Sequence, residues 1–554
     1  MWKQILILLL LVVILATRTV VEAGSGIPLP EPALSVQNSE LVSDIPQANL
    51  KLTAQDWWDD AVFYEIFVRS FYDSNCDGIG DFNGINQKLD YLQALGVNAI
   101  WLMPINPSPS YHGYDIVNYY AVNHEYGSME NFKRLLDEIH RRDMHLIVDL
   151  VLNHTSSAHP FFVDANNNLN SPYRDWYIWS ETDPGNGWHP GGQGYYYGFF
   201  WSGMPDLNYT NPEVTAQMDN VVRYWLDDIG VDGFRVDAAK HLIEDGAQRE
   251  NTPATHDWYK EFFVAYKTDH PDAYTVGEVY GAGGFIAKTY TGQLDHVFNF
   301  ELASGFVNSA NGRSNTGVKS AYTLTLKDMP QGNYATFLTN HDQNRAMSVF
   351  NGDLGKAKAA ASLLLTAPGT PFIYYGEEIG MQGKKPDEDI RLPMQWSADP
   401  QAGFTCLPTG DSDSAQVWRA PNEDYPTVNV AYQLDDGDSL LQHYQALIAL
   451  RSAHPALRIG STSLIATDST ALFAALRTTD AEQILVLVNL SDQPLSEFAL
   501  SAEDSPLAAG EYQLESLLGN LAFSLIVEEN GAFDLNLLLD VPIQPNQTFI
   551  LRFE

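Results

Sequence analysis

The sequence predicts an α/β protein built on a (β/α)8 TIM barrel, with a small inserted domain after the third strand and a C-terminal antiparallel β-sandwich domain. Short, β-rich apolar runs alternate with amphipathic helical stretches, and this alternation repeats eight times. A doubly wound sheet is the alternative, but it usually has fewer strands and a glycine-rich phosphate turn. The eight runs span residues 61–68, 97–103, 145–152, 231–237, 273–279, 295–300, 334–339 and 371–376.

Departures from this alternation predict the domain boundaries. Residues 155–210 are rich in aromatic residues and poor in helix signals, so we expect an inserted domain there. The catalytic barrel would then comprise residues 56–154 and 211–457. Residues 458–554 contain short alternating runs that are typical of an antiparallel β-domain. Residues 24–55 are rich in Pro, Ser, Gln and Ala without periodicity, which indicates a linker.

The first 23 residues have the pattern of a secretory signal peptide. Lys3 is followed by an apolar run over residues 5–16, and small residues at 21–23 offer a cleavage point. The apolar run is shorter than the roughly 18 residues expected of a membrane span. The sequence therefore predicts a secreted protein, extracellular or periplasmic, with an uncleaved anchor as the alternative.

The charge balance is strongly acidic, with 70 Asp and Glu against 31 Lys and Arg and a net charge of -39. Nucleic acids and anionic membranes would repel such a chain, so neither is an expected partner. No stable membrane association is expected. The charge says nothing about a neutral substrate, and the sequence leaves the oligomeric state open.

Charged and polar side chains follow several of the predicted strands. They are Asp149, Asn153 and His154 in the third strand region, Arg235 and Asp237 in the fourth, Glu278 in the fifth, and Asn340, His341 and Asp342 after the seventh. Active residues of a barrel come from the C-terminal ends of its strands, so these side chains should meet at one mouth. Asp, Glu and Arg are seldom buried without partners, which favours a functional cluster.

Arg235 and Asp237 are two residues apart, so they share one face of a strand. Close carboxylates are suited to glycoside hydrolysis, in which one attacks the sugar carbon and a protonated one supplies the leaving-group proton. We expect the arginine to lower the pKa of Asp237 and keep it ionised. Burial and neighbouring negative charge should keep the acid protonated. An ion pair that only closes the barrel is the alternative.

Five segments carry a family resemblance, in the order DLVLNH (149–154), MPDLN (204–208), GFRVDAAKH (233–241), GEVY (277–280) and FLTNHD (337–342). They resemble the conserved regions of the α-amylase superfamily, glycoside hydrolase family 13, and the resemblance runs from about residue 57 to the end. It implies a retaining mechanism on α-glucosidic bonds. Asp237 would be the nucleophile, Glu278 the general acid/base, and Asp342 the carboxylate that holds sugar hydroxyls.

The resemblance also implies a set of substrate-binding residues. They are Tyr114 in HGYD, His154, Arg235, Lys240, His241, His341 and Arg391 in RLPMQW. Tyr114 and the histidines His154 and His341 match residues that hold the sugar at the cleavage point. The Lys240–His241 pair matches residues that contact glucose on the leaving-group side. A structural role is the alternative for His154 and His341, and it is the favoured interpretation for Asp149.

The loop DSNCDGIGD (73–81) predicts a calcium site. Asp73, Asn75, Asp77 and Asp81 place hard oxygen ligands at alternating positions of a tight loop, which suits Ca²⁺. An EF-hand is excluded because its twelfth position would be Gly84 rather than Glu. The family resemblance adds the carbonyl of Ile79. An acidic surface loop without metal is the alternative.

The resemblance implies a second candidate calcium site at the junction between the insertion and the barrel. Its ligands would be Asn153, Asp206 and the backbone carbonyl of His241. Relatives with an insertion as short as this one also occur without that metal, so both outcomes stay open.

The chain has two cysteines, Cys76 and Cys406. Cys76 lies in the predicted calcium loop after the first strand, and Cys406 follows the eighth strand. First and eighth strands are neighbours in a closed barrel, and an exported chain permits a disulfide between these residues. Two free thiols are the alternative.

The substrate indications are mixed. Ala238 and the Lys240–His241 pair resemble α-amylases, whereas PYRDWYIW (172–179), RLPMQW and the short insertion resemble the oligosaccharide-cleaving branch. We favour a secreted α-amylase acting on starch and maltooligosaccharides. The nearest alternative is an exo-acting α-glucosidase or a cyclodextrin or pullulan hydrolase. A remote alternative is a non-catalytic, transporter-associated family member. The aromatic residues at 173–201 could stack on sugar rings or pack the insertion.

Overall fold

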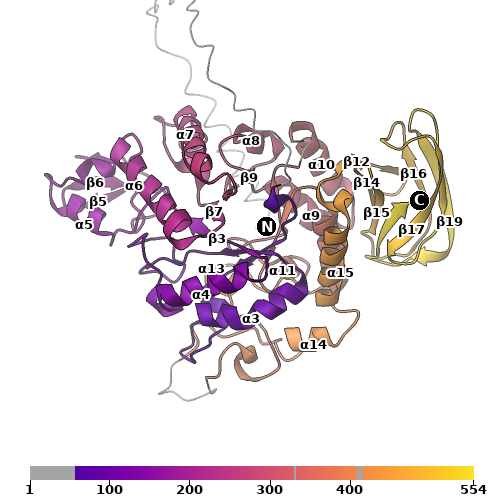
Figure 1. The fold of residues 1–554 in the computed structure, drawn as a ribbon, viewed down its shortest axis with the longest axis horizontal. Coiled ribbons are helices and arrows are strands. Elements are labelled where there is room, and N and C mark those ends of the chain that lie inside the picture. The colour runs from indigo at the N-terminus through magenta and orange to yellow at the C-terminus, as the bar shows by residue number, and fades with distance from the viewer. Residues whose placement is uncertain (1–55, 330–331, 408–415) are drawn as a thin grey trace, which may run out of the picture. The chain divides into compact units, whose positions relative to one another are not determined.

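The computed structural model describes residues 56–329, 332–407 and 416–554, so the predicted signal peptide and linker lie outside it. Eight parallel strands form the predicted barrel, in the order β10-β11-β1-β2-β3-β7-β8-β9 (Figure 1). A parallel bridge between Phe298 and Ala335 brings the two end strands together. The barrel strands are β1 Phe63–Ile66, β2 Ala99–Leu102, β3 His145–Leu150, β7 Gly233–Val236, β8 Tyr274–Gly277, β9 His296–Val297, β10 Ala335–Thr336 and β11 Thr370–Tyr374.

The barrel strands are almost wholly buried, because side chains fill the barrel on one face and helices cover the other. Each strand overlaps one of the eight predicted runs. The longer helices are α3 Phe82–Leu95, α4 Met129–His140, α6 Pro212–Arg223, α7 Pro253–Asp269, α9 Phe300–Gly312, α10 Thr316–Asp328, α12 Leu354–Thr366 and α15 Leu440–Ala453. The shorter ones are α2 Val68–Phe71, α5 Pro160–Asn167, α8 Gly284–Thr289, α11 Ala346–Val349, α13 Asp387–Ile390, α14 Val430–Leu434 and α16 Pro455–Arg458.

Local sequence explains where the first outer helices begin and end. The Asp81 side chain accepts a hydrogen bond from the Gly84 N–H and so caps the start of α3. Gly96, with φ of 97°, ends that helix in the left-handed conformation that glycine adopts readily. Helix α4 begins with a capping box between Ser128 and Asn131. Asp81, which forms this cap, is also one of the predicted calcium ligands.

The insertion after β3 forms a small antiparallel sheet in the order β4-β6-β5, with bounds Trp179–Ser180, Gly194–Tyr197 and Trp188–Gly191. It also contains α5, which the sequence reading did not anticipate. The helix starts with Pro160 at its first position and a His159 cap, both ordinary start signals. A bridge between His154 and Asp206 links the insertion to the end of β3.

The C-terminal region is antiparallel β-structure, as predicted. One sheet has the order β12-β14-β15-β20-β17-β18 and the other β13-β16-β19, and a hydrophobic core that includes Leu476, Leu500 and Leu551 lies in this region. The strands are β12 Ser461–Leu464, β13 Ala466–Thr467, β14 Leu472–Thr478, β15 Gln483–Asn489, β16 Leu495–Ala502, β17 Gly510–Leu518, β18 Ser524–Val527, β19 Phe533–Ile543 and β20 Thr548–Phe553. Arg477 ties this region to the barrel by donating to the Thr366 carbonyl at 2.7 Å.

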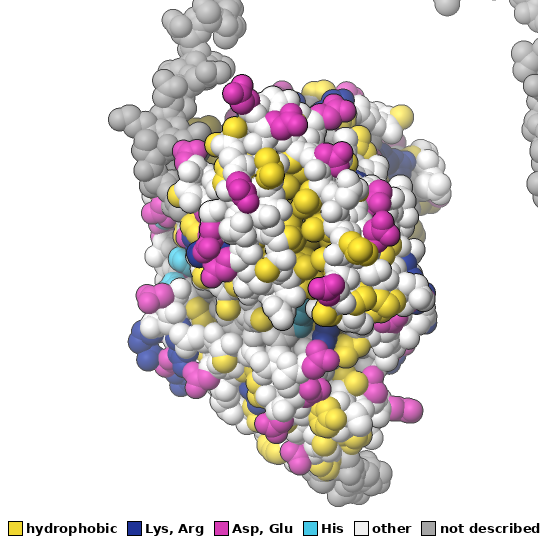
Figure 2. Space-filling model, turned by 90° about the vertical axis from the view of Figure 1, so that its right-hand side faces the viewer, with side chains coloured by type: hydrophobic (Ala, Val, Ile, Leu, Met, Phe, Trp, Pro, Cys, Tyr) yellow, Lys and Arg dark blue, Asp and Glu magenta, His cyan; other side chains and the backbone are white. Residues whose placement is uncertain are grey.

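The side of the molecule that carries the C-terminal strands shows a band of hydrophobic side chains among scattered acidic ones (Figure 2). Leu538 and Val541 on β19 are 80% and 76% exposed. None of the helices in the described part of the chain combines the length and apolar character that a membrane crossing requires.

Candidate active site

Arg235 on β7 forms the centre of a carboxylate cluster and is 1% exposed. Its Nη1 donates to Asp149 Oδ1 at 2.8 Å and to Asp237 Oδ1 at 2.6 Å, and its Nη2 donates to Glu278 Oε2 at 2.8 Å. The barrel register explains this convergence, because Asp149 and Arg235 are paired across β3 and β7. One guanidinium therefore contacts carboxylates that come from three neighbouring strands.

Asp237 follows β7 directly and lies beside Glu278, whose Oε2 accepts a hydrogen bond from the Ala238 N–H at 3.2 Å. Burial raises the pKa of Asp237, and the charge and hydrogen bond of Arg235 oppose that rise. The net direction is upward, which corrects the expectation that Arg235 brings this pKa below its ordinary value. The arginine does oppose protonation, but desolvation of the buried carboxyl is the larger effect.

The other two carboxylates have contrasting environments. Burial, together with the charges of Asp237 and Asp342, raises the pKa of Glu278 despite the opposing Arg235 charge, the direction expected for a proton donor. For Asp342, burial also acts upward, but His341 and Arg391 lower the pKa to about 2. Arg391 Nη2 lies 2.9 Å from Asp342 Oδ1. The net shifts are therefore opposite, upward for the pKa of Glu278 and downward for that of Asp342.

Asp149 differs from these three because its side chain is fully buried and does not line the cavity. Trp101 Nε1 and Tyr114 OH both donate to its Oδ2 at 3.2 Å. Burial raises the pKa of Asp149 to about 7, with the Arg235 charge opposing. These contacts agree with the structural role favoured from the sequence.

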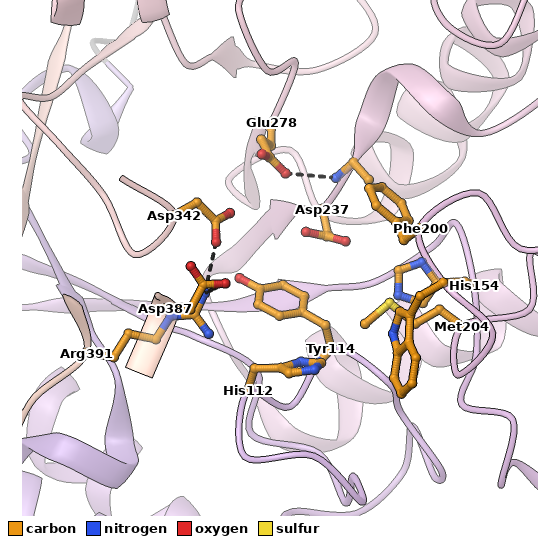
Figure 3. Close-up of a pocket in the computed structure, with 12 residues that line it drawn as sticks. His112, Tyr114, His154, Phe200, Met204, Asp237, Glu278, Asp342, Asp387 and Arg391 are labelled. Atoms are coloured by element: carbon orange, nitrogen blue, oxygen red, sulfur yellow. Dashed lines mark hydrogen bonds and ion pairs between the residues drawn. The ribbon is translucent and has the colours of Figure 1, made fainter. Parts of the chain in front are cut away.

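A cavity of about 290 Å³ opens above the carboxylates (Figure 3). Of the predicted site residues, it is lined by Tyr114, His154, Asp237, Glu278, Asp342 and Arg391. A neighbouring cavity of about 250 Å³ contains the predicted pair Lys240 and His241 and shares Glu278 and Asp342 with the first. Arg235 and His341 line neither cavity and lie behind the residues that do.

His154 lines the cavity and has one unpaired ring nitrogen. Its Nε2 is buried and has no hydrogen-bond partner among the described residues. Burial lowers its pKa to about 4, so the ring is neutral near pH 7. An unpaired buried nitrogen is costly, and a substrate hydroxyl would satisfy it.

The Lys240–His241 pair is placed on the other side of Glu278. Lys240 Nζ pairs with Glu250 Oε2 at 2.6 Å, and the His241 ring stacks on Phe199 with ring centroids 4.2 Å apart. Both side chains are held by protein contacts while they line the second cavity.

The aromatic residues of the insertion differ in burial. Four of them are buried and pack the insertion, namely Trp176, Tyr177, Tyr196 and Tyr197. Phe200 and Trp201 are instead 45% and 47% exposed and line the first cavity.

Sequence reasoning missed several residues that line the first cavity. They are His112, Met204 and Asp387. Asp387 could have been found, because it precedes Arg391 by one helical turn, and these two side chains are 3.6 Å apart. The others have no spacing that distinguishes them from packing residues.

The predicted calcium loop is folded around Asp73. Asp73 Oδ1 accepts from the Cys76 N–H at 2.7 Å and Oδ2 from the Gly78 N–H at 2.8 Å. Asn75 and Asp77 bond to each other through their side chains at 2.9 Å. No group of three or more His, Cys, Asp or Glu side chains in the described ranges is arranged as a metal site. The donor set is nevertheless all oxygen, carboxylate plus amide, and that chemistry fits Ca²⁺.

A disulfide closes this region, because Cys76 and Cys406 are bonded with Cα atoms 5.3 Å apart. The segment that carries Cys406 also contacts Asp73 directly. Thr405 Oγ1 donates to Asp73 Oδ2 at 2.6 Å, and the Asp73 N–H donates to the Phe404 carbonyl at 3.0 Å. The disulfide therefore links the loop covalently to the segment whose residues Phe404 and Thr405 hydrogen-bond to Asp73.

The second candidate calcium site contains unpaired oxygen atoms. Asn153 Oδ1 is buried and has no hydrogen-bond partner among the described residues, and Glu244 Oε1 is in the same state. Asp206 is buried and interacts with both residues. Burial and the Glu244 charge raise its pKa, and a hydrogen bond from the Asn153 side chain opposes that rise. Unpaired buried oxygens next to a carboxylate fit a hard cation. Glu244 was not among the ligands expected from the sequence.

A cluster of close carboxylates at the C-terminal mouth of a (β/α)8 barrel is suited to glycoside hydrolysis, which places the protein in the class of glycoside hydrolases together with the family match that follows. The chain belongs to the α-amylase family, glycoside hydrolase family 13, because residues 65–460 match the family described as alpha amylase, catalytic domain.

Individual relatives agree with this placement. The chain is 41% identical to Alpha-amylase 3 of Dictyoglomus thermophilum, over 79% of this chain and 86% of that one. It is 35% identical to an Oligo-1,6-glucosidase of Parageobacillus thermoglucosidasius, over 79% and 91%. The crystal structure of an alpha-amylase from H. orenii superimposes with a TM-score of 0.74 at 37% identity and covers 89% of this chain and 99% of that one.

Proposed function

We propose that this chain is a secreted, retaining α-amylase that cleaves α-1,4-glucosidic bonds of starch and maltooligosaccharides. The observation that supports it best is the shared contact of Arg235 with Asp237 and Glu278 beside the lined cavity. Retaining glycosidases need two close carboxyl groups with different protonation states. Glu278 has a raised pKa, which suits a proton donor, and the Arg235 charge and hydrogen bond favour the ionised form of Asp237.

The reaction follows as a double displacement. The Asp237 carboxylate attacks the anomeric carbon while Glu278 donates its proton to the glycosidic oxygen of the leaving sugar. Glu278 then takes a proton from water, which attacks the covalent intermediate and releases the product. Asp342 stays ionised and accepts hydrogen bonds from hydroxyls of the bound sugar ring. The neutral His154 ring lines the same cavity and can hydrogen-bond to the sugar through its unpaired Nε2.

Product analysis of the purified chain tests the substrate. Soluble starch, maltose, isomaltose and panose would be incubated in parallel. Rapid loss of iodine staining with a ladder of short maltooligosaccharides is the expected result, because two adjoining cavities on either side of Glu278 suit an internal glucan segment. Glucose release from the short sugars with starch nearly untouched would contradict it.

That second result would establish the other candidate, an exo-acting α-glucosidase or a cyclodextrin or pullulan hydrolase. The similarity to an oligo-1,6-glucosidase over four fifths of the chain favours this candidate. The Asp237→Asn variant distinguishes an enzyme from a non-catalytic, transporter-associated protein. In an enzyme it should abolish glycosidase activity, whereas an accessory protein would show no such activity with or without the change.

We also propose that the chain binds Ca²⁺, at the loop of Asp73, Asn75, Asp77, Ile79 and Asp81 and at the junction of Asn153, Asp206 and His241. The metal would neutralise the acidic oxygens at both places. Thermal unfolding with and without a chelator tests this, since a bound ion stabilises the folded state. Chelation should lower Tm in the wild type, and Asn75→Ala or Asn153→Ala should reduce that drop if its site is real. An unchanged Tm would contradict the proposal.

Secretion is tested separately by sequencing the N-terminus of protein recovered from the culture medium or periplasm. A mature start close to residue 24 is expected, and a chain retained with Met1 in the cell would contradict the signal-peptide proposal.

A further inference from the structure

Glu65 on β1 is a buried carboxylate that bonds to a residue of the active site without lining either cavity. It is 2% exposed, and its Oε1 lies 2.5 Å from Nδ1 of His341, which is fully buried. The other ring nitrogen of His341, Nε2, lies 2.7 Å from Tyr114 OH and 3.4 Å from Asp342 Oδ2. The imidazole thus connects a carboxylate on the first strand with two groups that line the cavity.

The connection continues to the nucleophile. Tyr114 OH donates to Asp149 Oδ2 at 3.2 Å, and Asp149 Oδ1 accepts from Arg235 Nη1 at 2.8 Å. The same Nη1 donates to Asp237. Figure 3 shows the Tyr114 phenol directed toward the space between Asp237 and Asp342. A continuous hydrogen-bonded chain therefore joins β1 to the end of β7.

The direction of each hydrogen bond in this network follows from which of its two atoms can donate a proton. A carboxylate can only accept, so His341 Nδ1 must carry a proton toward Glu65. If Nε2 is also protonated, it donates to the Tyr114 oxygen, and the phenol proton is then free to go to Asp149. A neutral ring would leave a lone pair on Nε2 facing the Asp342 carboxylate. Burial disfavours the charged ring, but Asp342 and Glu65 together raise the pKa of His341 above its ordinary value.

We propose that Glu65 is a positioning residue that keeps His341 doubly protonated and so fixes the direction of the hydrogen-bond chain reaching Asp237. It acts through His341 and does not touch the substrate. The inference rests on the proposed glycosidase function for its kinetic consequence, but the protonation step does not depend on any substrate.

Several ionisable groups face this pair and enter any pH dependence. Around His341 they are Glu65 on β1, Tyr114 after β2, Asp149 on β3, Asp237 after β7, Glu278 after β8, and Asp342 and Arg391 beyond β10 and β11. Around Glu65 they also include Tyr374 on β11 and Glu377 after it. Only Glu65 contacts Nδ1 among the described groups.

Glu65→Gln is the test variant, because it keeps an acceptor oxygen of similar reach and removes only the charge. His341 should then lose its second proton at lower pH. We expect the alkaline limb of the kcat/KM profile to move down by about one pH unit, with activity near wild type at acidic pH. Glu378→Gln is the matched control, since Glu378 is equally buried but bonds to Tyr64 and Tyr91.

Two kinetic outcomes would overturn the proposal. An equal loss at every pH would show that Glu65 has only a structural role. An alkaline limb that stays in place would show that Glu65 does not set the protonation state of His341. In a His341→Gln background, Glu65→Gln should cause no further loss, and an additive loss would count against action through His341.

Nuclear magnetic resonance of histidine labelled with ¹⁵N measures protonation without substrate. The His341 signal, assigned by its loss in His341→Gln, should show two protonated nitrogens at pH 7 in the wild type. Glu65→Gln should shift that titration to lower pH. A neutral His341 in the wild type at pH 7 would overturn the proposal even if no variant folds. Absence of wild-type activity on every glucan would instead refute the proposed function. The ¹⁵N titration of His341 would then still decide whether Glu65 keeps that ring doubly protonated.

Discussion

Two groups of carboxyls lie beyond the strand ends of this barrel, and they have different partners. Asp237 and Asp342, in the active site, contact the cations Arg235 and Arg391. Glu377, after β11, accepts instead from the phenol of Tyr444 at 2.9 Å. The residue beside it, Glu378, likewise accepts from two tyrosines.

The partners decide the protonation states. Burial raises the pKa of Glu377 to about 8, and its Oε2 is buried with no partner among the described residues. The Asp342 side chain is 35% exposed, and the neighbouring cations His341 and Arg391 lower its pKa to about 2. Exposure and the charge of the neighbours therefore both distinguish the two groups. The charge of the neighbour separates a group that can do chemistry from one that only supports the fold.

The largest effect is expected for Asp237→Asn. The amide cannot attack the sugar carbon, so kcat should fall by about ten-thousandfold or more. Initial rates on maltooligosaccharides measure it. Glu377→Gln is the control from the other group and should retain nearly full activity. Comparable losses in both variants would remove the functional contrast between the groups.

Arg235→Gln should have the next largest effect, because it removes the cation that three carboxyls share. We expect kcat to fall about a hundredfold or more. The acid limb of the pH profile should move to higher pH, since Arg235 opposes protonation of Asp237. Unpaired buried carboxylates should also cost about 3–5 kcal/mol of stability.

Denaturant unfolding and the pH profile measure both effects of that variant. Arg235→Lys tests whether a charge alone is enough if the glutamine variant does not fold. Arg313→Gln is the surface control, because Arg313 forms an exposed ion pair with Asp492 and should matter little. An acid limb that stays in place would contradict the assigned effect on Asp237.

Glu377→Gln should change how stability depends on pH. A carboxyl whose folded pKa is raised to about 8 binds more protons folded than unfolded between pH 4.5 and 8. Stability then falls as pH rises across that window, and the glutamine variant lacks this contribution. The wild type should lose up to about 4 kcal/mol more than the variant between pH 5 and 8. Denaturant unfolding at both pH values measures this, and parallel slopes would contradict it.

Tyr91→Phe should have the smallest effect. It removes one of two phenol donors to Glu378 Oε1, at 2.6 Å, and should lower stability by about 1–2 kcal/mol with activity unchanged. Thermal unfolding measures the change. Tyr432→Phe is the control, since Tyr432 is 59% exposed. An equal change in Tm in both variants would show that the hydrogen bond from Tyr91 to Glu378 contributes no more to stability than an exposed phenol does.

Much of the fold was predictable because barrel strands are buried on both faces and read as continuous apolar runs. The convergence of Arg235, Asp237 and Glu278 was predictable for a related reason, since strand alternation and strand ends determine where side chains point. The helix α5 was not, because the insertion follows no periodicity.

Other features depend on contacts between residues far apart in the sequence, which no local sequence pattern indicates. Glu65 is separated from His341 by 276 residues, and nothing around either residue signals their contact. The direction of the Asp237 pKa depends on how much burial outweighs Arg235, and spacing alone gives only the second of these effects. Glu377 and Glu378 appear in the sequence as ordinary acidic residues, and only their tyrosine partners reveal the role.

The bridge between Cys76 and Cys406 spans 330 residues and joins segments that follow β1 and β11, two strands that pair directly. Seven of the eight barrel strands lie between the two cysteines. A single peptide-bond cut anywhere in that span would leave both fragments covalently attached. Limited proteolysis within that span should therefore give a nicked protein that migrates as one species until a reductant is added, so a protease must cut more than once to release any of these seven strands.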